Sequence, residues 1–264
     1  IITGLKRTED GIFRNGVRAW TSQAVHAGDV IKTHLVETEP SDGILPRPVP
    51  FSVVYEDDDI LVVDKPADTP IHPSIGNYEN TLANGIAWYF EQKGEPFVYR
   101  CINRLDRDTT GLIVLAKHAL SAAVLSQAMR SREIHRTYQA FALGETAASG
   151  TIDAPIARLN GSLIQRTVDF ASGERSVTHY RTLAHCSVFS HLELNLETGR
   201  THQIRVHMAY IGHPLLGDTL YNKTPGTFPR QALHSASLSF VHPITGEPLN
   251  FHAPLPEDMQ NLLT

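Results

Sequence analysis

The sequence predicts an α+β fold, in which a mainly antiparallel mixed β-sheet is flanked by helices and a small β-rich segment stands at the N-terminus. Three observations support this prediction. Segments that read as strands outnumber those that read as helices. The two kinds do not alternate regularly along the chain, which favours the α+β class. The 264 residues are enough to bury a substantial core.

The chain divides into three predicted parts. Residues 12–35 alternate short apolar stretches with turns at Asn15–Gly16 and Ala27–Gly28–Asp29, which is typical of a small β-rich unit. The stretch EPSDGILPRPVP, residues 39–50, holds four prolines and shows no periodicity. We therefore predict an N-terminal segment over residues 1–38, a Pro-rich linker over 39–50 and a larger domain over 51–264.

Local patterns place the main elements of the larger domain. Two strand pieces joined by an acidic turn are expected in VVYEDDDILVVDKP, residues 53–66. A helix is expected over residues 118–130, HALSAAVLSQAMR, because apolar residues recur there at helical intervals without Gly or Pro. Alternating apolar and polar residues predict half-buried strands in HRTYQAFAL (135–143) and SVFSHLELNLET (187–198). A further helix is expected between Thr198 and Tyr210.

Composition narrows the class of protein. Hydrophobic residues make up 41% and charged residues 19% of the chain, as in an ordinary globular protein. No apolar run is long enough to span a membrane, and the first residues lack the charged-then-apolar order of a signal peptide. Cys101 and Cys186 are the only cysteines, too few for a disulfide framework or a thiolate zinc site. We expect a cytoplasmic protein in a reducing compartment.

The net charge of −5 hides an uneven distribution. Residues 1–60 hold ten acidic and six basic side chains, including the run EDDD at residues 56–59. Between Arg100 and Arg136 the balance reverses, with seven Lys or Arg against three acids. Such a region favours a polyanionic partner, but charge also fluctuates along any sequence, so the distribution alone leaves both interpretations open.

The stretch INRLDRDTTGLIVLAK, residues 102–117, joins a charged, loop-like half to an apolar, strand-like half. Burial of the strand half would hold the loop rigidly at the mouth of a sheet while its carboxylates stay near solvent. The charged residues of the loop are Arg104, Asp106, Arg107 and Asp108. Taken alone, they are also compatible with a salt-bridged turn that has no role in function.

A second polar stretch, ETGRTHQIRVHMAYIGHPLLGD, spans residues 197–218. Three histidines and two arginines fall within fourteen positions of it. His202 and His207 are five residues apart, which is poor geometry for two metal ligands on one helix, and no HExxH motif accompanies them. We therefore expect no metal site. As isolated residues, these histidines are either hydrogen-bonded structural groups or phosphate contacts.

Five motifs in a fixed order carry a resemblance to a known family. They are VYEDDDILVVDKPADTPIHPS, INRLDRDTTGL, HRTYQA, ETGRTHQIRVHMAYIGHPLLGD and QALHSASLSFVHPITGEPLNFHAPLP. Together they resemble the RluA-type family of RNA pseudouridine synthases over about residues 51–258. The resemblance implies an isomerase that converts specific uridines of structured RNA, in ribosomal RNA, tRNA or both, into pseudouridine. Because this reaction oxidises nothing and imports no group, the resemblance implies no cofactor and no metal, in agreement with the absence of a GxGxxG motif or a P-loop.

The resemblance also implies roles for single residues. Asp106, in the RLD motif, corresponds to the catalytic aspartate, and Arg205 to the arginine that pairs with it and keeps it ionised. Tyr138 corresponds to the tyrosine that stacks on the target uracil. Arg104 corresponds to the arginine that fills the space left when the uridine leaves the helical stack. Substrate contacts are expected from the other basic residues of these motifs, Arg107, Arg200, His202 and His207.

Three positions depart from the usual pattern of the family. Asn103 stands where His is common before RLD, Thr110 replaces the usual Ser, and Asp68 occupies a turn position where Gly is common. We expect these changes to tune the site rather than abolish activity. Residues 12–35 resemble the C-terminal part of a small RNA-binding module of ribosomal proteins. The basic helices usual in that module are not evident here, so RNA binding by this segment is an open question.

Two alternatives belong to other classes of function. A catalytically inactive RNA-binding relative would keep the basic groove without Asp106, Tyr138 and Arg205, so their joint presence argues against it. A metal-dependent hydrolase built on the fourteen histidines would lose its activity in chelator. We expect a monomer whose partner is RNA, with neither a metal nor a membrane involved.

Overall fold

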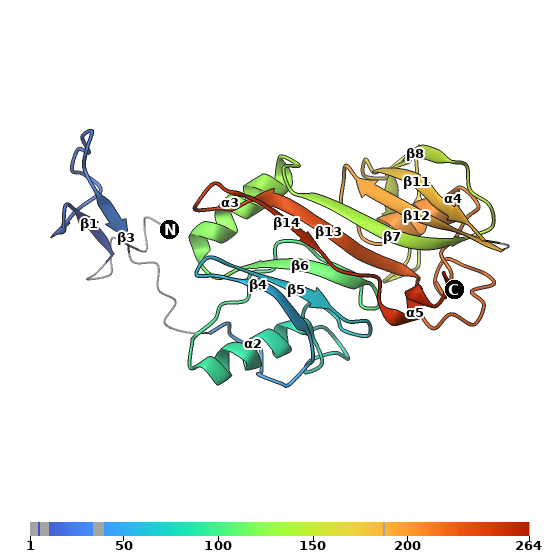
Figure 1. Ribbon diagram of the computed structural model, residues 1–264, viewed down its shortest axis with the longest axis horizontal. Coiled ribbons are helices and arrows are strands. Elements are labelled where there is room, and N and C mark those ends of the chain that lie inside the picture. Colours follow the sequence, from blue (N-terminus) through green and yellow to red (C-terminus); the bar gives the residue numbers. More distant parts are fainter. Residues whose placement is uncertain (1–4, 6–10, 34–39, 187, 264) are drawn as a thin grey trace.

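The computed structural model describes residues 5, 11–33, 40–186 and 188–263. Its larger domain is built on one nine-stranded sheet in the order β4-β5-β6-β13-β7-β12-β11-β8, with β14 on β13 (Figure 1). The strands of this sheet are β4 Ser52–Glu56, β5 Ile60–Lys65, β6 Thr110–Ala116, β7 His135–Leu143, β8 Ser149–Asp153, β11 Val177–His185, β12 Phe189–Leu196, β13 Leu233–Val241 and β14 Pro248–His252. The helices are α2 Leu82–Lys93, α3 Ala119–Arg130, α4 Gln203–Tyr210 and α5 Glu257–Gln260.

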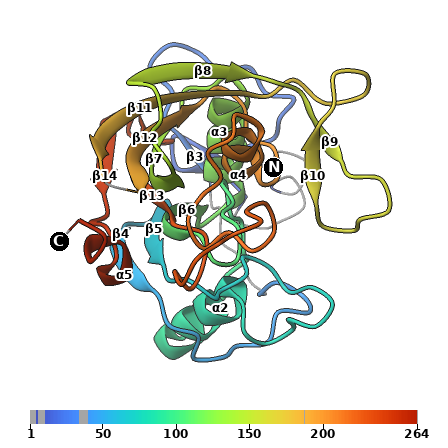
Figure 2. The ribbon, with the colours of Figure 1, turned by 90° about the vertical axis from the view of Figure 1, so that its right-hand side faces the viewer.

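The direction of the strands confirms the predicted fold class. In the described part of this sheet, β6 and β13 form the single parallel pair, and the other neighbours pair antiparallel. Two further strands, β9 Ile156–Arg158 and β10 Arg166–Val168, form a separate hairpin beside α4 (Figure 2). The expected acidic turn between β4 and β5, the helix α3 and the strands β7 and β12 are all present.

The centre of the core is formed by β5 and β6. β6 is buried along its whole length, because helices cover the sheet on both sides. One face packs against α2 through Val63, Ile113, Leu115, Leu82, Ile86 and Phe90. The opposite face packs against α3 through Val62, Leu112, Val114 and Leu125. Strands covered on both faces lack a polar side, which explains the unbroken apolar run in GLIVLA.

Helix α2 was not predicted from the sequence. It begins with a capping box, in which the Thr81 hydroxyl accepts from Asn84 N and the Asn84 amide oxygen accepts from Thr81 N. Gly85 masks the helical pattern, but it is needed for packing, because a Cβ there would lie 2.5 Å from the carbonyl oxygen of Val49. The predicted linker, from residue 40 onward, runs along this helix without regular structure, and Asn84 donates to Leu45 O at 2.7 Å. Residue 39 lies outside the described residues.

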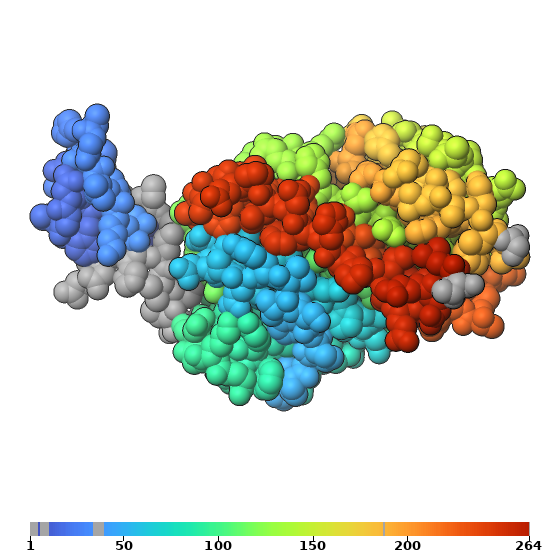
Figure 3. Space-filling view, viewed as in Figure 1, coloured from blue at the N-terminus to red at the C-terminus, as the bar shows by residue number. Residues whose placement is uncertain are grey.

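The N-terminal segment contains a small sheet in the order β2-β1-β3, in which β1 is Ile12–Arg14, β2 is Val17–Arg18 and β3 is Ile31–Thr33. The predicted turn at Asn15–Gly16 closes its first hairpin, with positive φ angles of 51° and 79°. In Figure 3 this sheet forms a body of its own beside the larger domain. Residues 1–4, 6–10 and 34–38 of the predicted segment lie outside the described part. Among the described residues, no helix has the length and apolar character needed to cross a membrane.

Glu56 links the end of β4 to two other elements. Its carboxylate accepts hydrogen bonds from Tyr89 Oη at 2.6 Å, Lys93 Nζ at 2.8 Å and Lys117 Nζ at 3.0 Å. Burial raises the pKa of Glu56, but the hydrogen bonds from Lys93, Tyr89 and Lys117 outweigh it and lower the pKa to about 2. The acidic stretch of the sequence is therefore used to fasten α2 and the end of β6 to β4.

Replacement of this carboxylate should destabilise the protein in a pH-dependent way. Because the folded pKa lies below the ordinary value of 4.5, the stabilisation is complete above that value and is lost as the pH falls toward 2. Glu56→Gln should lower the free energy of unfolding at neutral pH by about 1–2 kcal/mol, a figure reduced for partial exposure. Urea unfolding at neutral pH and at about pH 3 tests this. The difference in free energy of unfolding between Glu56→Gln and the wild type should narrow in acid. Glu95→Gln, at an exposed position of the loop that follows α2, should unfold like the wild type at both pH values.

Candidate active site

A cleft of about 890 Å³ is formed by parts of the chain that are distant in sequence. They include the loop before β6, the end of α3, the start of β7 and the loop between β12 and α4. Tyr138 is part of the lining, and most of the ionisable side chains there are basic. The basic ones are Arg104, Arg130, Arg132, Arg136, Arg200, His72 and His135, and the acidic ones are Asp106 and Glu197. The basic region predicted between residues 100 and 136 and the stretch from Arg200 onward thus meet in one cleft.

Asp106 lies in the loop that precedes the buried strand β6, as the sequence predicts. Asn103 anchors the start of this loop. Its amide nitrogen donates to Leu112 O at 3.1 Å, and its amide oxygen accepts from Val114 N at 2.9 Å. On the other side, Thr109 N donates to Asp106 O at 3.1 Å. The loop is therefore tied to a core strand, and Asn103 serves this purpose with a donor and an acceptor on one side chain.

A buried lysine holds the same loop by its backbone. The Lys65 ammonium is fully buried and donates to Pro66 O at 2.7 Å, Thr69 O at 3.0 Å and Arg107 O at 2.8 Å. Burial lowers the pKa of Lys65 to about 7, against the opposing effect of Asp108 and Asp106. Three acceptors around one nitrogen match the three hydrogens of the charged form. The surroundings of Lys65 therefore suit its charged form, in which all three ammonium hydrogens bond to backbone carbonyls.

Arg205 joins two carboxylates. Its Nη1 donates to Asp106 Oδ2 at 3.0 Å, while Nε and Nη2 donate to the two oxygens of Asp218 at 2.7 and 2.9 Å. Arg205 is buried and Asp218 is fully enclosed. Burial lowers the pKa of Arg205, but the hydrogen bonds and charges of Asp218 and Asp106 raise it by more. Because Nε, Nη1 and Nη2 all donate to carboxylates, the plane of the guanidinium is fixed and Asp106 is held in one defined position.

His202 approaches Asp106 from a second side. The Tyr221 hydroxyl accepts from Arg166 N at 2.9 Å and lies 2.7 Å from His202 Nδ1. His202 Nε2 lies 3.9 Å from Asp106 Oδ2, which is beyond hydrogen-bond distance. Burial lowers the pKa of His202, although Asp106 opposes this. The guanidinium carbon of Arg205 lies 5.1 Å from the centre of the Tyr221 ring.

Tyr138 lies on β7, between the neighbouring strands β12 and β13, and is almost fully buried. A smaller pocket of about 60 Å³ shares six lining residues with the cleft. Its lining includes Arg104, Asp106, Tyr138, Arg200, His202 and Arg205. The structure therefore brings together the three predicted catalytic residues and three of the predicted substrate-binding ones.

The arginines of the cleft differ in how they are paired. Arg200 forms an ion pair with Glu174 at 2.6 Å, and Arg132 lies 3.4 Å from Glu197. No hydrogen bond or ion pair engages the Arg104 guanidinium within the described ranges. Arg136 likewise has no carboxylate partner there, and its buried Nε has no hydrogen-bond partner. Arg104 and Arg136 are therefore the cations most available to an anionic ligand.

Two of the predicted substrate contacts line neither the cleft nor the small pocket. Arg107 is exposed and pairs with Asp68, which adopts a positive φ of 53° in its turn. The expectation for His207 is wrong. This side chain is fully buried, and its ring nitrogens contact Thr178 Oγ1 at 2.9 Å and Ala154 O at 2.8 Å. With both nitrogens satisfied in the core, His207 has no contact left to offer RNA.

The helix predicted between Thr198 and Tyr210 is shorter than expected. It begins at Gln203, because His202 adopts a left-handed conformation with φ 59°. The Gln203 side chain accepts from Arg200 N and from Thr198 Oγ1, which folds the preceding residues into a loop. Asp218 and Tyr221 were given no role from the sequence. Asp218 ends the quoted GHPLLGD motif, but its pairing with Arg205 follows only from the fold.

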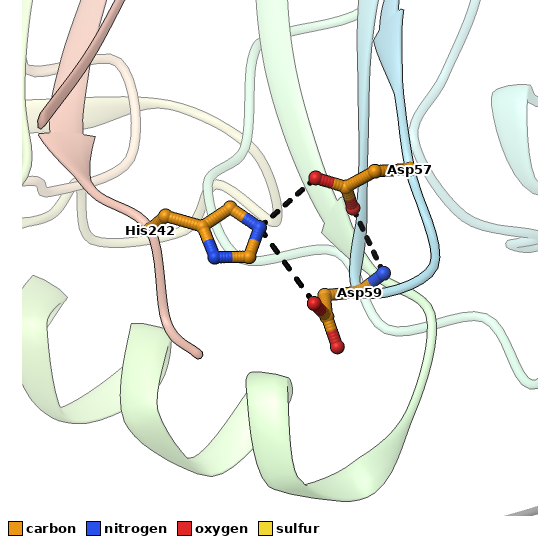
Figure 4. A group of neighbouring side chains, drawn as sticks. All are labelled: Asp57, Asp59 and His242. Atoms are coloured by element: carbon orange, nitrogen blue, oxygen red, sulfur yellow. Dashed lines mark hydrogen bonds and ion pairs between the residues drawn. The ribbon is translucent and has the colours of Figure 1, made fainter. Parts of the chain in front are cut away.

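A possible metal-binding group among the described residues lies outside the cleft, at Asp57, Asp59 and His242 (Figure 4). His242 Nε2 is 2.9 Å from Asp57 and 3.8 Å from Asp59. Its Nδ1 accepts from two backbone N–H groups at 3.0 and 3.3 Å, so the ring hydrogen is on Nε2 and points at Asp57. A neutral imidazole that binds a metal through Nε2 needs its hydrogen on Nδ1 instead. The group of Asp57, Asp59 and His242 is therefore a structural hydrogen-bonded cluster.

Comparison with known proteins agrees with this geometry. A family model described as RNA pseudouridylate synthase matches residues 59–210. The chain belongs to the RNA pseudouridylate synthase family. The predicted RluA-type resemblance and the assignment as an isomerase are thereby confirmed.

Relatives resemble the chain over most of its length. It is 40% identical over 264 residues to the uncharacterized RNA pseudouridine synthase YjbO of Bacillus subtilis, covering 100% of this chain and 93% of that protein. It is 43% identical over 251 residues to ribosomal large subunit pseudouridine synthase D of Vibrio cholerae, covering 89% and 76%. The solved structure of human RNA Pseudouridylate Synthase Domain Containing 1 is 26% identical, with a TM-score of 0.66 and coverage of 79% and 84%.

The two-carboxylate arrangement predicts a large effect for Asp218→Asn. The substitution removes the negative charge of Asp218 from a buried ion pair. The positive charge of Arg205 is then compensated by Asp106 alone. We expect a loss of about 2–4 kcal/mol in the free energy of unfolding, measured with urea. Asp42→Asn, an exposed position, is the matched control and should leave stability unchanged. A loss below about 1 kcal/mol for Asp218→Asn would contradict the importance of this pair.

Proposed function

We propose that this pseudouridine synthase acts on uridines in ribosomal RNA of the large subunit, with Asp106 as its catalytic residue. The observation that carries the proposal is the Asp106 carboxylate, held by the buried Arg205 at the junction of a small pocket and an arginine-lined cleft. The relatives named as large-subunit synthases support the class of RNA. A folded RNA fits the cleft because its phosphates would meet Arg104 and Arg136, which lack carboxylate partners among the described residues.

The reaction sets what the site must supply. The bond between uracil nitrogen 1 and ribose carbon 1′ breaks, the base turns, and carbon 5 bonds to the same ribose carbon. The hydrogen of carbon 5 leaves it, and nitrogen 1 gains a hydrogen, so the atoms balance without an added group. Asp106 acts beside the ribose, either as a covalent partner of the sugar or as a base that takes a proton from it. Arg205 fixes the direction of the carboxylate.

The other lining residues bind and orient the base. Tyr138 forms one wall of the small pocket, and we assign it the stacking contact with uracil and a part in removing the proton from carbon 5. His202 lines the small pocket beside Asp106, with Nε2 at 3.9 Å from Oδ2, and we assign it a contact with the RNA substrate. Arg104 lies at the border of pocket and cleft, where it can occupy the gap that an extruded uridine leaves in the RNA.

The experiment that tests the substrate is pseudouridine mapping of total RNA from cells with and without this gene. We expect one or a few positions in large-subunit ribosomal RNA to lose the modification. Loss confined to tRNA would replace the proposed RNA class but keep the activity. No change at any position, together with inactivity of the purified protein on the same RNA, would refute the proposed function.

The assignment of Asp106 predicts a loss of chemistry without a loss of binding. Asp106→Asn keeps the size of the side chain and removes its charge, so the single-turnover rate of pseudouridine formation should fall by a factor on the order of 10³ or more. The matched control is Asp42→Asn, because Asp42 is exposed and lines neither the pocket nor the cleft. Comparable losses for the two variants would show that Asp106 has no special role.

The proposed role of Arg104 predicts a dependence on RNA structure. Arg104→Ala should slow the reaction severely on folded RNA and mildly on a short unstructured RNA, where unstacking costs less. Arg107→Ala, in the same loop but outside the cleft and paired with Asp68, should affect neither substrate strongly. Single-turnover rates on both RNAs decide the matter. Equal losses for Arg104→Ala on the two substrates would indicate a role in the chemistry instead.

A further inference from the structure

The residues that follow Asp106 are held by their carbonyl oxygens. Lys65 Nζ and Thr69 N both donate to Arg107 O, at 2.8 and 3.1 Å. The next carbonyl, that of Asp108, accepts from Arg230 Nη1 at 3.1 Å. Two buried cations therefore hold two consecutive peptide groups of the loop that carries the proposed catalytic carboxylate.

Arg230 connects this loop to the C-terminal helix. Its side chain is buried, and Nη1 also donates to Gln231 O at 3.1 Å and Leu233 O at 3.3 Å. On the other side of the guanidinium, Nε and Nη2 donate to the two carboxylate oxygens of Asp258 at 2.8 and 2.9 Å. The adjacent Gln231 donates from its amide to Thr109 Oγ1 at 3.3 Å, so the loop is held at two successive residues.

The position of Asp258 is itself fixed. It lies in the first turn of α5, and the next residue, Met259, is fully buried in a small apolar cluster with Phe141 and Ala232. Because a guanidinium is planar, a carboxylate that engages Nε and Nη2 also sets the direction of Nη1. The orientation of the donor that reaches Asp108 O is therefore determined by a helix near the end of the chain.

We propose that Arg230 and Asp258 are positioning residues for the reaction, through which helix α5 keeps the Asp106 loop in its productive place. The proposal rests on the proposed function of Asp106, and it assigns neither residue a contact with RNA. Neither Arg230 nor Asp258 lines the cleft or the small pocket. Their effect is thus on the rate of the bound complex and not on its formation. A misplacement of a catalytic group by about 1 Å can lower a rate by about a hundredfold.

The decisive variant is Asp258→Asn, which keeps the shape of the side chain and weakens its hold on Arg230. We expect the single-turnover rate at saturating RNA to fall by about tenfold or more, with the RNA dissociation constant changed by less than about twofold. Asp258→Glu, which keeps the charge, should recover most of the rate. The matched control is Glu257→Gln, which removes the same charge from the adjacent, exposed position of α5 and should change neither quantity.

A double variant tests whether Asp258 acts through Arg230. If it does, Arg230→Lys with Asp258→Asn should be no slower than Arg230→Lys alone. Multiplied losses in the double variant would overturn the proposal, and so would a wild-type rate for Asp258→Asn. Equal losses of rate and of RNA binding would also overturn it, because they indicate less folded protein. An inactive wild-type protein would instead refute the proposed function, so the two failures are distinguishable.

Discussion

The Arg205 guanidinium between the carboxylates of Asp106 and Asp218 is the interaction on which the site depends. The charges of Arg205, Asp106 and Asp218 are compensated only while all three side chains stay in position. Movement of one would leave an unpaired charge in a buried site, which costs free energy. Asp218 takes two of the hydrogen bonds and is fully enclosed, so it fixes the plane of the guanidinium. Asp106 takes the remaining one and stays partly accessible to the small pocket. The enclosed carboxylate fixes the guanidinium, and the carboxylate of Asp106, the proposed catalytic group, faces the small pocket.

The sheet brings these residues together through one unusual pairing. β6 and β13 run parallel, so the loop before β6 and the residues before β13 lie at the same edge. The approach is close at Gly111, where φ is 112° and a Cβ would lie 2.3 Å from Ser235 O, so the position requires glycine. On the far side of β13, Ser235 pairs with Tyr138 on β7. The loop with Asp106, the segment with Arg230 and the strand with Tyr138 therefore converge because of strand order.

Periodicity and composition predicted those helices and strands whose own residues show a clear pattern. The strands β5, β7 and β12 and helix α3 follow from their own residues, whereas α2 was missed because Gly85 serves the packing of another segment. The resemblance to a family supplied Asp106, Tyr138 and Arg205, which the structure places around one pocket. Asp218, Tyr221 and Arg230 could not be found in this way, since their importance lies in contacts between distant segments. His207 was misread because a histidine within a motif looks the same whether its ring faces a ligand or the core.

The net charge of the chain proved a poor guide to its partner, for a physical reason. Several acids that make the protein negative are used in its own structure. Glu56 accepts from Lys93 and Lys117, Asp57 accepts from His242, and Asp59 accepts from His118. These groups lie outside the cleft, and salt screens charges over about 8 Å at physiological ionic strength. An RNA phosphate in the cleft would therefore experience the nearby arginines far more than the distant carboxylates. What decides binding is the set of cations that the fold leaves without a partner, and this set can be read only from the pairing of side chains in space.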